Sequence, residues 1–204
     1  MRPALFVGVL ALAACGDDGG SPGAGDAGID SSVIDGSTDA AIDAPAGAFT
    51  LTSPTIMMGM PFPVAHMCDG ANTSPALNWS NPPAGTLSFA VIFTDNTNSL
   101  IHSIIYDIPA TLTALPADVD KVYAPPDVPG AHQTTAFPQQ NPPRGYLGPC
   151  PSVADGAHTY EFALYALNVA TLPGATMGTT RVQARTAILA NMISTVSLIG
   201  TADR

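Results

Sequence analysis

The segment LSFAVIFTD, residues 87–95, constrains the fold of this chain more than any other. It is almost continuously apolar and includes aromatic and β-branched side chains, which is typical of a central strand buried on both faces. Three more segments have the composition and length of strands, namely residues 49–55, 102–109 and 160–168. The sequence therefore predicts a mostly β domain.

Loops rich in proline and glycine separate these strands. The loop at residues 124–146, APPDVPGAHQTTAFPQQNPPRGY, is too long to be a mere connection and is expected to cover another part of the protein. Only the end of the chain has helical spacing, which predicts one late helix that Thr179 or Thr180 would cap. Its apolar face would contain Val182, Leu189, Ile193 and Val196.

The first residues are typical of an export signal. MRPALFVGVLALAAC has one basic residue, Arg2, followed by an apolar run too short to span a bilayer, which predicts a signal peptide at residues 1–14. The run ends in LAAC, which resembles the bacterial lipoprotein box, where the signal is cut before a cysteine that carries a lipid. Cys15 is the expected lipidation site. The alternative is an ordinary secretory signal with an unrelated cysteine.

A tether is expected to follow at residues 15–47, because glycine, alanine, serine and seven aspartates leave it no face to bury. Repulsion between the carboxylates should extend it. The folded domain would then span residues 48–204. These features predict a lipid-anchored protein of the bacterial cell envelope, and Gly16 after the cysteine favours the outer membrane.

Most of the negative charge belongs to this tether. The chain has 16 acidic and 6 basic residues, and without the seven tether aspartates and Arg2 the domain keeps a net charge of about −4. No basic cluster exists in the sequence, which argues against nucleic acid as a partner.

Two cysteines, Cys68 and Cys150, remain for the domain. In an oxidising compartment they allow one disulfide, which would close a loop of about 80 residues and contribute roughly 4–5 kcal/mol on the chain-entropy model. The alternative is two unrelated thiols. A metal site is disfavoured, because neither cysteine has a second ligand at a zinc-finger spacing.

Four motifs occur in a fixed order along the domain. They are CDGANTSPALNWSNPPAG (68–85), FAVIFTD (89–95), IHSIIYDIPA (101–110) and GYLGPCPSVADGAHTYEFALYALN (145–168). Together they resemble the phosphatidylethanolamine-binding protein family, in its bacterial branch often called Raf-kinase-inhibitor-like, and residues 171–204 resemble the helical end of that branch. The resemblance implies a β-sandwich with a small C-terminal helical element.

The resemblance also implies an anion pocket. Histidines can donate to a phosphate oxygen and gain charge near neutral pH, a tyrosine adds a neutral donor, and an aspartate can hold an imidazole in one tautomer. In this sequence the family positions are Asp95, His102, Gly148 with Pro149, His158 and Tyr160. Two departures are expected to loosen and reshape the pocket rim: DNTNS at residues 95–99 lacks the usual second acid and both prolines, and Ser103 replaces an aromatic residue.

Three classes of function remain open at this point. The first is a membrane-anchored module that binds small anionic or phosphorylated groups, such as phospholipid head groups. The second is a protein-interaction or inhibitor role, as the kinase- and protease-inhibiting members of the resembled family suggest, with a partner that the sequence does not name. The third is an enzyme that uses a metal or acid–base chemistry. H-E-x-x-H is missing from the sequence, and G-x-S-x-G is missing from the domain at residues 48–204, so we expect neither enzymatic activity nor a cofactor.

Other candidate residues have simpler interpretations. Trp79 is expected in the core, His66 has no assigned role, and His132 is expected to be solvated in its loop.

Overall fold

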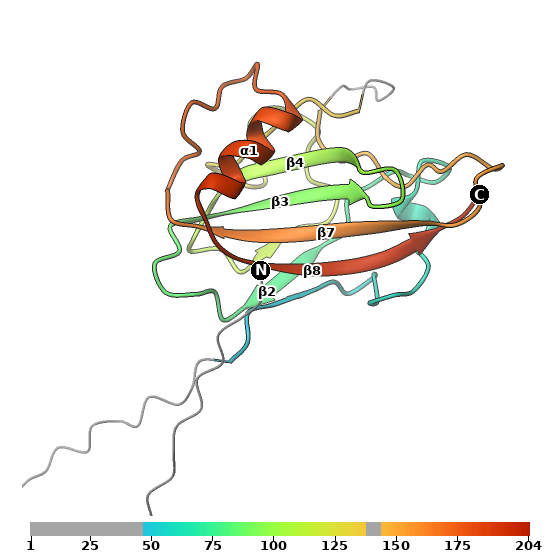
Figure 1. The fold of residues 1–204 in the computed structure, drawn as a ribbon, viewed down its shortest axis with the longest axis horizontal. Coiled ribbons are helices and arrows are strands. Elements are labelled where there is room, and N and C mark those ends of the chain that lie inside the picture. Colours follow the sequence, from blue (N-terminus) through green and yellow to red (C-terminus); the bar gives the residue numbers. More distant parts are fainter. Residues whose placement is uncertain (1–46, 138–143) are drawn as a thin grey trace, which may run out of the picture. The chain divides into compact units, whose positions relative to one another are not determined.

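The computed structural model describes residues 47–137 and 144–204 (Figure 1). The expected signal peptide, the lipidated Cys15 and nearly all of the tether lie outside these residues. Two antiparallel sheets form the described part. The smaller has the order β1 (Thr50–Thr52), β2 (Leu77–Ser80), β5 (Ala114–Leu115), and the larger has the order β6 (His132–Gln133), β4 (Leu100–Pro109), β3 (Ser88–Asp95), β7 (His158–Leu167), β8 (Met192–Ala202).

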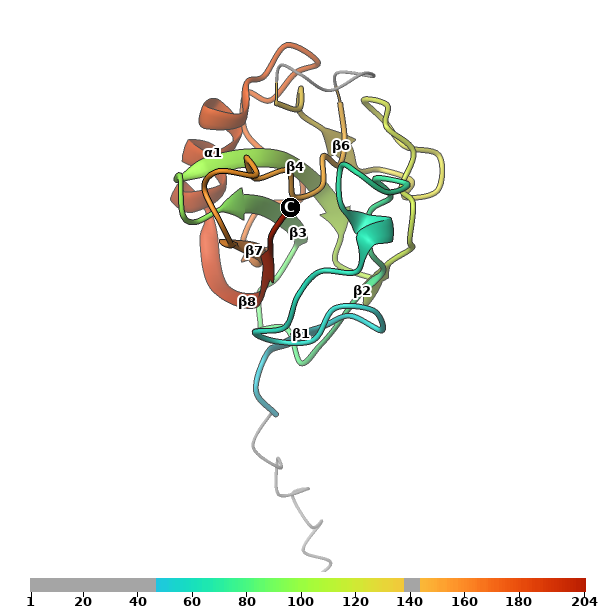
Figure 2. The same cartoon turned by 90° about the vertical axis from the view of Figure 1, so that its right-hand side faces the viewer.

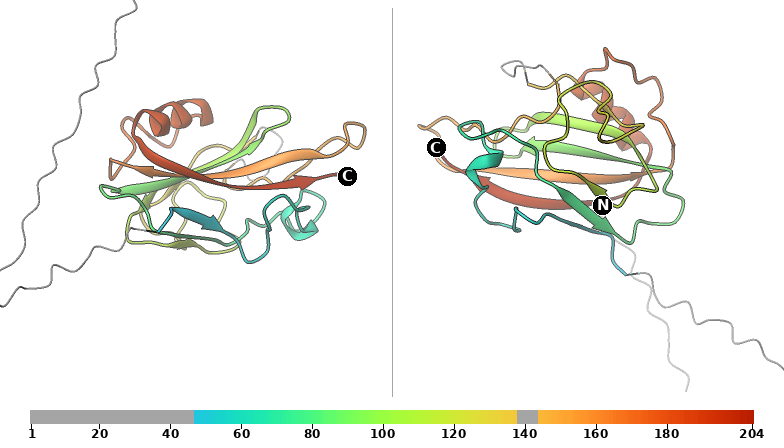
Figure 3. Two further views of the ribbon diagram at one scale, coloured as in Figure 1. Left: turned by 60° about the horizontal axis from the view of Figure 1, so that its bottom comes forward. Right: turned by 180° about the vertical axis from the view of Figure 1, so that it is seen from behind.

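The two sheets face each other, and the helix α1 (Arg181–Ala190) covers the outer side of the larger sheet (Figure 3). The remaining element is a short 3-10 helix at Val64–His66. The predicted fold class, a mostly β sandwich with one late helix, is therefore confirmed.

The position of strand β3 between two cores explains its unbroken apolar sequence. Phe89, Val91 and Phe93 point into the core between the sheets, where Phe93 stacks on Phe162 with ring centroids 4.2 Å apart. The alternate residues, Ala90 and Ile92, belong to a second core beneath α1. Successive side chains of a strand point to opposite faces, so an apolar layer on each side requires apolar residues at every position.

The other predicted strands are present with shifted ends. The strand expected at residues 49–55 shortens to β1, and the one expected at 160–168 begins two residues earlier, at His158. Trp79 lies in β2 and is buried, as expected. His132 was expected to be solvated in a loop. The loop placement was wrong, because His132 lies in β6, where its side chain is 30% exposed and its Nδ1 donates to Asp107 Oδ2 at 3.1 Å.

The buried face expected for the last helix was also wrong. Thr180 caps α1 through a capping box with Gln183, as the sequence suggests, but the buried residues of the helix are Ala184 and Ile188. Val182 is 71% exposed and Leu189 is 38% exposed. Ile193 and Val196 lie in β8, an eleven-residue strand, so the final part of the chain is not helical.

The reason is strand pairing. β8 pairs with β7 from His158↔Ala202 to Leu167↔Met192, and its side chains include the β-branched residues Ile193, Thr195, Val196 and Ile199. A ladder of this length and this composition favours a strand over continuation of a helix. The helical spacing of the four apolar residues in the sequence was a coincidence across the boundary at Asn191.

Candidate functional site

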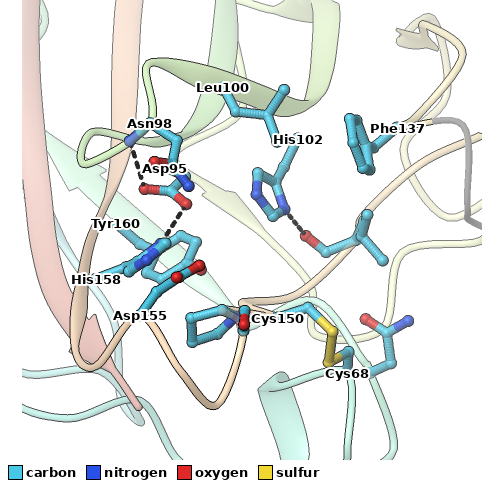
Figure 4. Close-up of a pocket in the computed structure, with 14 residues that line it drawn as sticks. Cys68, Asp95, Asn98, Leu100, His102, Phe137, Cys150, Asp155, His158 and Tyr160 are labelled. Carbon is cyan, nitrogen blue, oxygen red and sulfur yellow. Dashed lines mark hydrogen bonds and ion pairs between the residues drawn. A yellow bond between two sulfur atoms is a disulfide. The ribbon is translucent and has the colours of Figure 1, made fainter. Parts of the chain in front are cut away.

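A cavity of about 460 Å³ lies where β3 ends, β4 begins and β7 begins (Figure 4). Figure 2 shows this end of the sandwich, with the end of β3 and the start of β7 near the C-terminus. Asp95 is the last residue of β3 and pairs in register with Tyr160 of β7, while His102 lies near the start of β4. His158 and Tyr160 are two apart on one strand, and both line the cavity, as their spacing predicts.

Asp95 is the centre of a hydrogen-bond network. Its Oδ2 accepts from His158 Nδ1 at 2.8 Å, and its Oδ1 accepts from the backbone N–H groups of Thr97 and Asn98 at 2.9 and 3.2 Å. The carboxylate therefore has three donors and is 3% exposed. Its position fixes the tautomer of His158, because the proton on Nδ1 points at the carboxylate and leaves Nε2 for the cavity.

The same carboxylate holds the loop that departs from the family pattern. The bonds to Thr97 and Asn98 close the turn around the aspartate side chain, and Ser99 takes a left-handed conformation with φ +56°. These two hydrogen bonds restrict the backbone of the loop, which is the effect that the missing prolines would otherwise have. The rim is therefore tied down, contrary to the loosening that we expected from the sequence.

His102 is the second imidazole of the cavity. Its Nδ1 donates to the carbonyl of Leu147 at 3.1 Å, so its Nε2 is also left for the cavity. Burial lowers the pKa of His102, while the Leu147 carbonyl and the Asp95 carboxylate raise this pKa and the Arg181 guanidinium lowers it. Because burial is the largest of these effects, the pKa of His102 lies below its usual value and the neutral imidazole is favoured.

Tyr160 completes the polar floor between the two histidines. Its ring lies 5.5 Å from that of His102 and 6.3 Å from that of His158, measured between centroids. Burial, helped by the nearby Asp95 carboxylate, raises the pKa of the Tyr160 hydroxyl above its usual value. The hydroxyl therefore stays protonated and can donate a hydrogen bond at any physiological pH.

Gly148 and Pro149 lie behind the cavity wall and are not among its lining residues. The Gly148 N–H donates to Asn72 Oδ1 at 2.8 Å, and a Cβ at this position would come within 2.0 Å of the His66 carbonyl oxygen. The Pro149 carbonyl accepts from the Cys68 N–H at 3.0 Å. Because Gly148 has no side chain, the Gly-Pro turn can approach the backbone of residues 66–68 closely, and this contact supports the cavity wall.

The disulfide predicted between Cys68 and Cys150 is present, with Cα atoms 5.4 Å apart. Both cysteines line the cavity, so the bond joins the loop after the 3-10 helix to the segment that precedes β7. At the same rim Arg204 donates to both carboxylate oxygens of Asp69 at 2.6 Å. The rim is therefore held by a covalent bond and an ion pair.

The sequence interpretation missed Phe137, which lines the cavity, and Arg181, which contacts the Phe137 ring. Phe137, from the long proline-rich loop, stacks on His102 at 6.3 Å, and Arg181 at the start of α1 lies 5.5 Å from the centre of the Phe137 ring. The loop does cover something, as expected from its length, because Phe137 lines the cavity. Neither residue carried a sequence signal, since only tertiary packing brings them to His102.

Asn72, Asn98 and Asp155 also line the cavity and were missed as site residues. All three lie inside or next to segments that carry the family resemblance, so their positions in those motifs were the available signal. Figure 4 shows Asp155 on the same side of the cavity as His158.

Within residues 47–137 and 144–204, no cluster of three or more histidine, cysteine, aspartate or glutamate side chains is arranged to hold a metal ion. The same residues contain no helix of the length and hydrophobicity that crossing a bilayer requires.

Two facing antiparallel sheets, with a pocket of histidine and tyrosine side chains at one end of the larger sheet, define a class of small β-sandwich binding proteins. The family model described as "Phosphatidylethanolamine-binding protein" matches residues 52–203, and the chain belongs to this family.

Relatives in bacteria agree with this membership. The chain is 35% identical over 142 residues to the UPF0098 protein YbcL of Escherichia coli K12, which covers 64% of this chain and 74% of YbcL. A UPF0098 protein of Chlamydia pneumoniae is 33% identical over 162 residues, which covers 76% of this chain and 98% of the relative.

Solved structures show the same fold. The crystal structure of E. coli YbcL, described as a new member of the mammalian PEBP family, superposes with a TM-score of 0.68 at 32% identity, covering 76% of this chain and 98% of YbcL. The structure of a putative phosphatidylethanolamine-binding protein homolog, CT736 of Chlamydia trachomatis, gives a TM-score of 0.63 at 29% identity, covering 77% of this chain and 98% of CT736.

We predict that the charge of Arg181 helps to keep His102 neutral. In an NMR titration of the ring protons, the pKa of His102 should lie below 6.5, and Arg181→Gln should raise it, because a nearby positive charge disfavours protonation. Arg185→Gln on the same helix is the matched control and should leave the His102 titration unchanged. A wild-type pKa at or above 6.5, or no response to Arg181→Gln, would contradict this electrostatic account.

Proposed function

We propose that this protein binds a small anionic group of the phosphate type in the cavity, such as a phospholipid head group or a phosphorylated small molecule. We further propose that it acts as a binding protein and not as an enzyme. The observation that carries this proposal is the arrangement of its two imidazoles. Both His102 and His158 line the cavity, and each uses Nδ1 for a bond to the protein.

The free ring nitrogens support binding of an oxyanion. The bonds of His102 to Leu147 and of His158 to Asp95 both use Nδ1, which leaves Nε2 of each ring for a ligand in the cavity. When Nε2 of a ring carries a proton, it can donate a hydrogen bond to an oxygen of the anion. The Tyr160 hydroxyl can donate a further hydrogen bond to the same anion. A charge-assisted hydrogen bond contributes roughly 1.5–3 kcal/mol, which corresponds to about tenfold or more in affinity for each histidine.

The lowered pKa of His102 determines how the affinity for the anion depends on pH. Because burial keeps the imidazole neutral, an anion with no proton of its own has to bind together with a proton taken up at Nε2. Proton uptake is easier at lower pH. Affinity should therefore rise as the pH falls toward the pKa of His102.

The carboxylates of the cavity support a ligand that also has a cationic part. The charge of Asp95 is already balanced by three donors, whereas Asp155 lies beside His158 at the cavity wall (Figure 4). A carboxylate in this position would repel a bare polyanion and would attract an ammonium group on the ligand. A zwitterion such as phosphoethanolamine fits this combination of charges.

We also propose that the protein is held at the bacterial envelope by lipid on Cys15. The support is the short apolar run that ends in LAAC and the acidic segment that follows it. A chain of this composition would let the binding domain move near the membrane surface. Several acyl chains on one residue anchor a protein stably, since each buried CH₂ contributes about 0.8 kcal/mol.

We expect calorimetry with phosphoethanolamine, in a buffer without competing anions, to give an affinity that increases by up to about tenfold per pH unit between pH 8 and pH 6. His102→Gln and His158→Gln should each weaken binding by about tenfold or more. His132→Gln is the control, because that histidine pairs with Asp107 away from the cavity. Equal affinity for the wild type and both pocket variants across this range would mean that the cavity does not bind the ligand through its histidines.

The anchor is tested by Cys15→Ser, with signal cleavage and lipid attachment followed in the expressing bacterium. The variant should lose its lipid and leave the detergent phase in a phase-partitioning experiment, while the unchanged protein should enter that phase. If the variant is cleaved normally and still partitions into detergent, lipid on Cys15 is not the anchor.

A further inference from the structure

Three methionines project from one tight turn on the surface, far from any role in the cavity. The segment Met57–Met58–Gly59–Met60 forms a turn in which the Met60 N–H donates to the Met57 carbonyl at 3.1 Å. Gly59 has φ +74°, the conformation that the third position of a type II turn requires. The side chains of Met57, Met58 and Met60 are 66%, 59% and 48% exposed.

The turn is fixed to the edge of the larger sheet. The Gly59 N–H donates to the Ile199 carbonyl at 2.8 Å, and the Met60 carbonyl accepts from the Thr201 N–H at 3.0 Å. Phe62, two residues after Met60, is buried in the core between the sheets. Figure 3 shows the segment after β1 running beside β8. The backbone that carries the three thioethers is therefore held in place by its neighbours on both sides.

The spacing of the methionines lets their sulfur atoms converge. The first and fourth residues of such a turn have Cα atoms within about 7 Å, and the second residue lies at the apex of the same turn. A methionine side chain is unbranched with three rotatable bonds, so three sulfurs can meet around one centre without a change in the backbone. A Cβ added at Gly59 would meet nothing within 4 Å, which means that the space over the turn is open.

Thioether sulfur is a soft and uncharged donor that selects soft monovalent cations over Zn²⁺, Ca²⁺ or Mg²⁺. Thiols, the stronger soft ligands, do not compete in the described part of the chain, because Cys68 and Cys150 form the disulfide. Three thioether ligands carry no charge, so the site with its ion would keep the positive charge of that ion. A positive charge is favourable on a domain whose net charge is about −4.

From this geometry we propose that Met57, Met58 and Met60 form a surface site for Cu(I), with three thioether ligands. The site is independent of the anion cavity, so it does not depend on the function proposed above. It also explains why three large apolar side chains stand together in solvent, a grouping that is otherwise unfavourable on a protein surface.

The experiment titrates Ag⁺, a redox-stable substitute for Cu(I), into the full chain with Cys15→Ser, which removes the remaining thiol, and with the methionine methyl groups labelled with ¹³C. Native mass spectrometry gives the stoichiometry, and NMR identifies the residues that bind. We expect one Ag⁺ per chain in the first step, with the methyl signals of Met57, Met58 and Met60 shifting together. An excess of Zn²⁺ should not reverse these shifts.

The matched variant replaces all three residues by leucine, which keeps the apolar surface and nearly the volume but removes the sulfur. Its affinity for Ag⁺ in the first step should fall by at least tenfold. Met177→Leu is the control, because Met177 is 60% exposed but stands alone in the loop before α1, and it should bind as the wild type does. Unchanged affinity in the triple leucine variant, or no shift of the three methyl signals, would overturn the proposal and leave the turn as an apolar surface only.

Discussion

The buried pair of Asp95 and His158, with 2.8 Å between carboxylate and imidazole, is the interaction on which the cavity depends. It joins the end of β3 to the start of β7, and its second carboxylate oxygen closes the β3–β4 turn that leads to His102. Breaking a buried pair by removing one partner costs about 3–5 kcal/mol in many proteins, because the other group stays buried without compensation. In this protein removal of the Asp95 carboxylate would release both the turn and the His158 imidazole.

The rest of the sandwich serves to place this pair. β3 is buried on both faces, with one apolar core against the smaller sheet and another beneath α1, so its end is held from both sides. The disulfide and the Asp69–Arg204 ion pair then fix the rim opposite the histidines. The cavity is therefore formed before any ligand arrives, which reduces the entropy lost on binding.

Local patterns in the sequence predicted several parts of this arrangement, whereas the set of pocket residues came from the family resemblance. The apolar run of β3, the two-residue spacing of His158 and Tyr160, and the single possible disulfide each follow from short stretches or from simple counting. Patterns that depend on partners far along the chain were not predictable in this way. β8 is a strand because β7 offers it a full ladder, and Phe137 and Arg181 reach His102 only after the long loop and α1 have packed.

The central claim is that His102 and His158 hold one anion between their Nε2 atoms, and crystals soaked with phosphate near pH 6 test it most directly. The account predicts a phosphate in the cavity with oxygen atoms about 2.7–3.2 Å from both Nε2 atoms, and with Nδ1 of each ring still bonded to Leu147 and Asp95. Phosphate bound away from both histidines, or a cavity that holds only water at saturating phosphate, would contradict it.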